Sequence, residues 1–192
     1  TGEDTATVTL TNTPPTAGLA GPTSGIEGTA ITLAASATDP SPADVAAGFT
    51  SAWSVTKNGN PFTAGMGSPI AFVPDDNGTY LVSLSATDKD GGTGTASVAI
   101  AVANVNPTVS IINAPETTPA GTPVDLTSVV LDPGTADTLT FAWVVTTDGS
   151  EYASGSQPEF SFTPLALGTY MVSVTVTDDD GGTANAVAAV RA

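Results

Sequence analysis

The chain has 192 residues, and its 20 glycines and 15 prolines leave little room for long helices. Three basic residues stand against 19 acidic ones, so the net charge of −16 would repel a nucleic-acid backbone, and we expect no nucleic-acid partner. No apolar run approaches the ~18 residues of a membrane span, so we expect none. The absence of histidine and cysteine removes common general bases and nucleophiles, and we predict no catalytic residues.

The first residues alternate in the way that a strand does. Residues 5–12 parallel residues 97–104 at an offset of 92. We interpret residues 1–11 as a surplus strand that belongs to a preceding domain of a longer array. Two alternatives are an ordinary first strand of the first domain and a strand donated to a neighbouring molecule.

Further along the chain, apolar residues recur with period two and predict several strands. In the first half, the residues that share one strand face are Phe49, Ser51, Trp53 and Val55, and then Tyr80, Val82, Leu84 and Ala86. In the second half they are Leu139, Phe141, Trp143 and Val145, and then Tyr170, Val172, Val174 and Val176. We expect the tryptophans and these tyrosines to lie in the core. The Asp-x-Gly-x-Tyr spacing at 76–80 also predicts a tyrosine corner.

The two halves are copies of one unit. Gly-Thr-Tyr occurs at 78–80 and 168–170, and Thr-Asp-x-Asp-Gly-Gly-Thr occurs at 87–93 and 177–183, both at an offset of 90. Upstream, near residues 40–50, the offset changes, which indicates small insertions in a loop. We therefore predict two all-β domains, at residues 12–103 and 104–192, each a Greek-key β-sandwich with about seven strands.

The segments Phe-x-Pro-x-x-x-Gly-Thr-Tyr at 72–80 and 162–170, each followed by alternating strand residues and Thr-Asp, resemble PKD (polycystic kidney disease) domains. The resemblance implies tandem immunoglobulin-like sandwiches from a large extracellular protein. The Trp-Asp-Phe-Gly-Asp-Gly signature of that family is replaced at 53–59 and at 143–149. A cadherin-like or other bacterial immunoglobulin-like relative is therefore the alternative.

In an immunoglobulin-like sandwich the B–C loop, the F–G loop and the start of the first strand share one pole, where this sequence concentrates its aspartates. Converging carboxylates need a cation, and oxygen ligands without nitrogen or sulfur favour Ca²⁺ over zinc, copper or iron. Calcium-binding relatives of the resembled families also use this pole. The predicted ligands are Asn12, Asp39, Asp44, Asp88 and Asp90 in the first repeat, and Asn104, Asn106, Asp132, Asp137, Asp178 and Asp180 in the second.

The alternative interpretation of Asp-x-Asp-Gly-Gly is a polar turn, in which aspartates accept backbone hydrogen bonds and glycines supply positive φ. The remaining acids we interpret as solvated charge on the opposite pole or on exposed faces. They are Glu27, Asp75, Asp76, Glu116, Asp125, Asp148, Glu151 and Glu159.

These features predict a structural spacer in a secreted or cell-surface protein, built as a calcium-stiffened tandem array or a surface filament. The connection at 104–107 is short and lacks a Gly/Ser tether, so an ion bound there would fix it. The expected partners are neighbouring repeats, further copies, or a surface glycan or protein. A carbohydrate- or protein-binding adhesion module is the alternative, with Phe62 and Tyr152 as its aromatic candidates. Paired carboxylates can hydrolyse glycosides, but catalytic sites are rarely duplicated in adjacent spacers.

Overall fold

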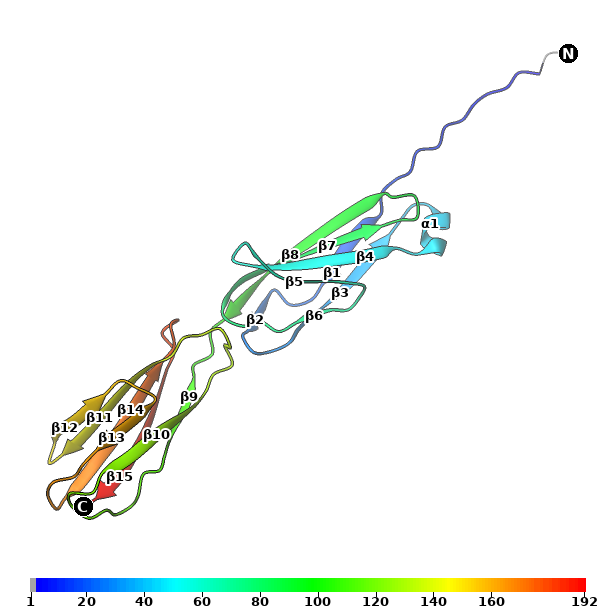
Figure 1. Cartoon of the computed structure of the whole chain (residues 1–192). Helices are drawn as coiled ribbons and strands as arrows, with labels where there is room; N and C mark the ends of the chain where they lie inside the picture. Colours follow the sequence, from blue (N-terminus) through cyan, green and yellow to red (C-terminus); the bar gives the residue numbers. More distant parts are fainter. Residues whose placement is uncertain (1–2) are drawn as a thin grey trace. The chain divides into compact units, whose positions relative to one another are not determined.

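The computed structural model describes residues 3–192, which form two compact units of β-structure (Figure 1). The first unit comprises residues up to 25, then 30–73 and 78–102, and the second comprises 26–29, 74–77 and 103–192. Each unit is a β-sandwich, which confirms the predicted all-β, immunoglobulin-like fold. Two short segments from the first half of the sequence, 26–29 and 74–77, thus pack with the second half.

The first unit contains two antiparallel sheets whose strand order gives the Greek-key pattern. One sheet has the order β1-β3-β6, from Thr16–Ala20, Ile31–Thr38 and Ile70–Phe72. The other has the order β2-β8-β7-β4-β5, from Ser24–Ile26, Thr93–Ala103, Gly78–Thr87, Thr50–Lys57 and Asn60–Met66.

The second unit repeats this arrangement. Its three-stranded sheet has the order β13-β10-β9, from Glu159–Phe162, Val124–Leu131 and Thr108–Ile112. Its four-stranded sheet has the order β12-β11-β14-β15, from Ser150–Gly155, Thr140–Thr147, Thr169–Thr177 and Thr183–Arg191. Strand β2 has no counterpart here, and only an isolated parallel bridge joins Thr117 to Arg191.

Both repeats use the same hairpin chemistry between their equivalent strands. In the β4–β5 hairpin, Asn58 and Gly59 have φ of 49° and 84°, and in the β11–β12 hairpin, Asp148 and Gly149 have φ of 51° and 76°. Positive φ at both central residues defines the two-residue turn that matches strand twist, and Asn-Gly and Asp-Gly are its preferred sequences. These turns fix the register of the two hairpins.

The alternating residues form one core in each unit, as predicted. Tyr80, Trp143 and Tyr170 are buried, whereas Trp53 is partly buried against the first core. The Trp143 ring stacks on Phe160, and its Nε1 donates to the Gln157 carbonyl at 2.8 Å. The aromatic residues are therefore core residues in both repeats.

A tyrosine corner ties the start of β14 to the preceding loop. The hydroxyl of Tyr170 donates to the Ala166 carbonyl at 3.0 Å and accepts from the Ala166 N–H at 3.3 Å. The side chain is 2% exposed, so the bond is shielded from water. This contact anchors the connection between the two sheets of the second unit.

The loop in which the sequence indicated insertions contains a short helix, α1 (Pro42–Ala47). Ser41 is its N-cap, and its hydroxyl accepts from the Asp44 N–H. A proline at the first turn and Gly48 with φ of 80° after the last residue define the two ends. Within residues 3–192 no helix is long and apolar enough to cross a membrane.

The amino-terminal segment forms no strand from residue 3 to residue 15, and β1 begins at Thr16. Val8 and Leu10 are 78% and 90% exposed. Residues 1 and 2 of the interpreted surplus strand lie outside the described residues, and its pairing with another domain stays a prediction. In the described part, it is not an ordinary first strand of the first unit.

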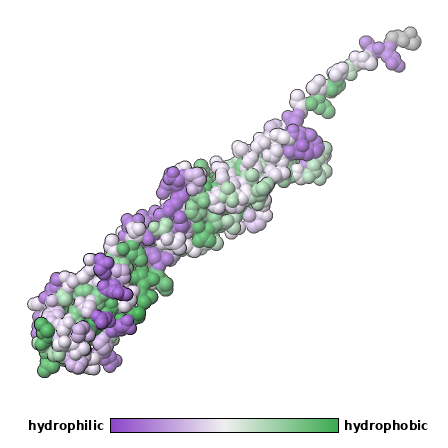
Figure 2. Space-filling model, viewed as in Figure 1, coloured by the Kyte–Doolittle hydropathy of each residue, from purple (hydrophilic) through white to green (hydrophobic). Residues whose placement is uncertain are grey.

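The surface carries few strong charges. Charged residues make up 11% of the sequence, and Figure 2 shows pale surface of intermediate hydropathy over much of the visible face. With so few charged side chains, any place where several acids gather is conspicuous. The loops at the ends of the strands are such places.

The tyrosine corner gives a first prediction. Replacing Tyr170 with Phe removes only the hydroxyl, so we expect a loss of about 1 kcal/mol in the free energy of unfolding of the second unit. Urea unfolding followed by fluorescence measures this loss. Thr169→Val, an exposed change on the same strand, is the matched control, and an equal stability of Y170F and wild type would contradict the anchoring role.

Candidate metal centre

One aspartate stabilises each F–G loop, which lies between β7 and β8 in the first unit and between β14 and β15 in the second. In the second unit, Asp178 Oδ1 accepts from the backbone N–H groups of Asp180 at 3.0 Å and Gly182 at 2.7 Å. In the first unit, Asp88 Oδ1 accepts from Asp90 at 2.9 Å and Gly92 at 2.8 Å. The polar-turn interpretation is therefore correct for the first aspartate of each motif.

The same two carboxylates also hold the segments that enter each sandwich. Asn12 Nδ2 donates to Asp88 Oδ2 at 2.8 Å, and Asn104 Nδ2 donates to Asp178 Oδ2 at 3.0 Å. The Asn12 hydrogen bond, with help from the backbone bonds, lowers the pKa of Asp88 against the opposing effect of burial. Both oxygens of each aspartate are engaged, so these side chains connect loop and linker.

The second unit gathers five further carboxylates beside this brace. Oxygens of Glu27, Asp132 and Asp137 lie within 4.8 Å of one another, and so do oxygens of Asp76, Asp137 and Asp180. Asp137 belongs to both groups and is therefore central. We call these five residues the acidic centre.

Glu27 is the most buried member of the acidic centre, with no exposed surface. Its Oε1 accepts from the Val105 N–H at 2.6 Å, while its Oε2 is buried without a hydrogen-bond donor among the described residues. Its backbone N–H donates to the Ala103 carbonyl at 3.2 Å. The interpretation of Glu27 as solvated charge was wrong, because residues 26–29 pack against the 103–105 segment.

Asp76 was also wrongly interpreted as solvated charge. The segment 74–77 is held to the B–C loop of the second repeat by the Ala136 N–H, which donates to the Asp75 carbonyl at 2.9 Å. Gly28, with φ of 67°, lies so close to Pro133 that an added Cβ would come within 2.6 Å of the proline side chain.

Several oxygens of the acidic centre have no donor among the described residues, although they are buried. They are Glu27 Oε2, Asp132 Oδ2, Asp137 Oδ1 and Oδ2, with the nearby Asn104 Oδ1. Burial, and next the charges of Glu27 and Asp132, raise the pKa of Asp137 to about 7. Burial is also the main cause of the raised pKa of Glu27.

The second repeat has little positive charge to balance the carboxylates of the acidic centre. Residues 103–192 contain one basic residue, Arg191, at the far end of β15 from the Asp178 loop. Carboxylate and amide oxygens in this number are the ligands that Ca²⁺ prefers. The residues present therefore fit a hard divalent cation.

The first unit assembles a smaller group with a different balance. Oxygens of Asp39, Asp44 and Asp88 lie within 4.8 Å of one another. The Lys89 Nζ lies 3.0 Å from Asp44 Oδ1 and also contacts Asp90 Oδ2. The Lys89 contact is the main cause of the lowered pKa of Asp44, so this group already contains a cation.

Two predicted ligands lie at the edges of these groups. Asp90 is exposed and pairs with Lys89, away from the convergence of Asp39, Asp44 and Asp88. Asn106 is exposed, and its Oδ1 lies beside Gly182, where an added Cβ would approach it to 2.7 Å. The Asp90 carboxylate does not belong to the oxygen groups described above.

The aromatic candidates for glycan binding are core residues. Phe62 packs edge-on against Tyr80 at 5.2 Å, and Tyr152 packs against Tyr170 at 4.9 Å between ring centroids. The Tyr152 hydroxyl donates to the Thr163 carbonyl at 2.6 Å. Both rings thus pack against the cores and form no exposed platform for a glycan, because their strands, β5 and β12, lie at the edges of the sandwiches.

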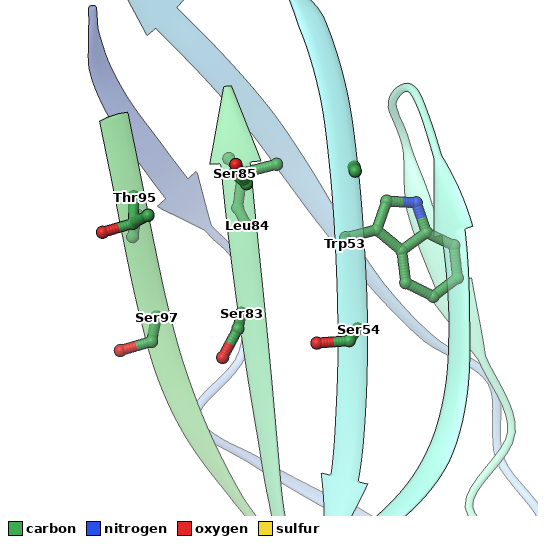
Figure 3. A pocket seen from close by; sticks show the side chains of 9 residues that line it. Trp53, Ser54, Ser83, Leu84, Ser85, Thr95 and Ser97 are labelled. Carbon is green, nitrogen blue, oxygen red and sulfur yellow. The ribbon is translucent and has the colours of Figure 1, made fainter. Parts of the chain in front are cut away.

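A shallow hollow on the first unit is lined mainly by small hydroxyl side chains. The residues that line it include Ser54, Ser83 and Ser97, which are cross-strand neighbours on β4, β7 and β8. Figure 3 shows these hydroxyls pointing opposite to the Trp53 ring. The hollow thus lacks an outward aromatic ring on which a sugar could stack.

Comparison with known proteins identifies a family resemblance for the second repeat. Residues 104–192 match the model of the PKD domain family. No curated protein matches the sequence.

Among solved structures, the chain is similar to fibronectin(III)-like modules of Clostridium thermocellum CbhA, with 16% identity, TM-score 0.36, and coverage of 91% of this chain and 93% of that one. The four N-terminal immunoglobulin domains of Dscam1 isoform 8.4 give 17% identity, TM-score 0.44, and coverage of 88% and 42%. The amphioxus IgVJ-C2 molecule gives 16% identity, TM-score 0.46, and coverage of 88% and 99%.

The structure predicts that Asp178 stabilises its loop without any metal. Asp178→Ala removes two backbone hydrogen bonds and the Asn104 contact from a buried carboxylate, so we expect a loss of about 2 kcal/mol or more in EDTA. Urea unfolding provides the measurement. Asp125→Ala, at an exposed position of β10, is the control, and a loss seen only in the presence of Ca²⁺ would contradict the bracing role.

The raised pKa of Asp137 predicts an unusual pH dependence for the metal-free protein. Between pH ~4, near its unfolded pKa, and pH about 7, the folded state retains a proton that the unfolded state has lost. The free energy of unfolding of the second unit should therefore fall as pH rises through this window. Urea midpoints in EDTA, followed through Trp143 in a Trp53→Phe background, measure it.

Asp137→Asn should flatten this pH profile, since the amide does not titrate. The matched variant Asp125→Asn should leave the profile of the parent unchanged. A parent protein whose stability is constant or rises over the window would contradict the assignment of Asp137 as the protonated member of the centre.

Proposed function

Starting from two PKD-like immunoglobulin-type sandwiches, we propose that this chain is a non-catalytic structural module of a secreted or cell-surface protein, stiffened by Ca²⁺ bound at the acidic centre. Its immediate partners are the neighbouring repeats of the same chain. The high negative charge of the sequence supports a role as a spacer, because it keeps such modules soluble and apart.

The observation that carries the proposal is the burial of Glu27 with an unpartnered Oε2 among other carboxylates. A buried anion without a counter-charge is costly, and proteins pair such groups or use them as metal ligands. Asp132 and Asp137 contribute further oxygens that lack donors among the described residues. A divalent cation would satisfy these oxygens together.

The position of the ligands along the chain supports the stiffening. Glu27 lies in the connection from β2 to β3, and Asp76 lies in the connection from β6 to β7. Asp132, Asp137 and Asp180 belong to loops of the second repeat. An ion held by both sets would tie residues 26–29 and 74–77 to the loops of the second repeat within the second unit, and its removal would leave mutually repelling carboxylates in that place.

We expect Ca²⁺ to stabilise the second unit. Extracellular modules bind Ca²⁺ with Kd of about 10⁻⁴–10⁻³ M. At 10 mM Ca²⁺ and a Kd of about 10⁻⁴ M the gain is about 2.7 kcal/mol, which raises Tm by roughly 15 °C for a domain of this size. Thermal melts followed through Trp143 fluorescence in the Trp53→Phe background test this shift.

Two variants separate ligand loss from general damage. Asp137→Asn removes the central carboxylate, and Gly134→Ala places a Cβ 2.4 Å from Asp137 Oδ2, which forces the ligand aside. We expect both to abolish the Ca²⁺-dependent shift, while Asp125→Asn retains it. Absence of a shift in the parent protein would refute the calcium site and leave the sandwich fold untouched.

The stiffening itself needs a measurement of shape. Small-angle scattering with Ca²⁺ and with EDTA should show a smaller spread of conformations when the ion is bound, and Asp137→Asn should resemble the EDTA state in both buffers. Identical scattering of the parent protein in the two buffers would contradict a mechanical role for the ion.

A further inference from the structure

The two copies of the Thr-Asp-x-Asp-Gly-Gly-Thr motif differ at their third position. The first copy has Lys89, and the second has Asp179 at the offset of 90 that relates the repeats. This single difference exchanges a positive for a negative charge beside otherwise matching loops. Both poles are therefore acidic, but only the first contains a positive charge.

Lys89 takes the place of a counter-ion in the first unit. Its ammonium lies 3.0 Å from Asp44 Oδ1, and the Asp44 side chain is 3% exposed. It also contacts Asp90 Oδ2, so one ammonium joins the α1 loop to the F–G loop. In the second unit, Asp179 instead accepts a hydrogen bond from the Thr138 N–H at 2.8 Å and adds negative charge near Asp137.

The two repeats also differ in the acidic residues at the positions of Glu27 and Asp76. Strand pairing of Ile31 with Phe72 and of Val124 with Phe162 makes β3 and β10 structurally equivalent. Counted from these pairs, the positions of Glu27 and Asp76 correspond to Ala120 and Ala166 in the second repeat. Glu27 and Asp76 thus have no acidic counterpart in the second repeat.

From these differences we infer that Lys89 is a built-in cation that replaces a divalent ion at the first unit, so that the chain binds one Ca²⁺ and its two repeats differ in calcium dependence. The stoichiometry rests on the proposed calcium site of the second unit. The role of Lys89 rests on the ion pair and on the group formed by Asp39, Asp44 and Asp88.

The test uses the one tryptophan that each unit possesses. In a Trp143→Phe background, the fluorescence of Trp53 reports unfolding of the first unit, and in a Trp53→Phe background, Trp143 reports the second. Lys89→Met preserves side-chain length and removes the charge. Lys57→Met, which changes the other lysine of the same unit, is the matched control.

We expect the midpoint of thermal unfolding of the first unit, followed through Trp53 and called the Trp53 transition, to be the same in EDTA and in 10 mM Ca²⁺ for the parent protein. Lys89→Met should lower it by about 5 °C in EDTA, and Ca²⁺ should restore it. Calorimetric titration with Ca²⁺ should give one bound ion for the parent and two for Lys89→Met. Lys57→Met should keep the parent's stoichiometry and calcium-independent Trp53 transition.

Three results would overturn the inference. A Trp53 transition that already rises with Ca²⁺ in the parent would show that the first unit uses the ion despite Lys89. An unchanged transition in Lys89→Met would show that the ammonium does not matter, and a loss that Ca²⁺ does not restore would reduce it to a simple ion pair. Failure of the second-unit calcium site appears separately, as a calcium-independent Trp143 transition.

Discussion

Repulsion among carboxylates that the fold brings together out of water is the constraint on which the rest of this structure depends. In the second unit, Glu27, Asp132 and Asp137 present buried oxygens that no donor among residues 3–192 satisfies. Burial disfavours the charged form of a carboxylate and neighbouring like charges disfavour it further, and both raise the pKa of Asp137, to about 7. A cation or a proton must balance the site.

The aspartates of the loops divide two tasks between them. Asp88 and Asp178 accept backbone and asparagine hydrogen bonds through both oxygens and thereby fix loop and linker. Asp132 and Asp137 retain free oxygens and face the other acids. One repeated motif thus supplies the rigid frame in both units, whereas the residues around it decide whether the frame surrounds an ammonium or an acidic centre.

The acidic centre was only partly visible in the sequence. Asp132, Asp137 and Asp180 follow from the repeat and from the rule that the B–C and F–G loops share a pole. Glu27 and Asp76 do not follow, because they precede Asp132 by more than 50 residues and reach it only through the packing of 26–29 and 74–77 onto the second unit. Their spacing contains no local signal for that long-range contact.

The sequence by itself determined the all-β class, the duplication, and the burial of Tyr80, Trp143 and Tyr170, because period-two alternation and turn residues act locally along the chain. Tertiary structure decided which charges meet. The helix α1 turns Asp44 toward Lys89, and the hairpin strands fold Phe62 and Tyr152 into the cores. Electrostatic energy depends on distance in space and on exclusion of water, and sequence separation specifies neither.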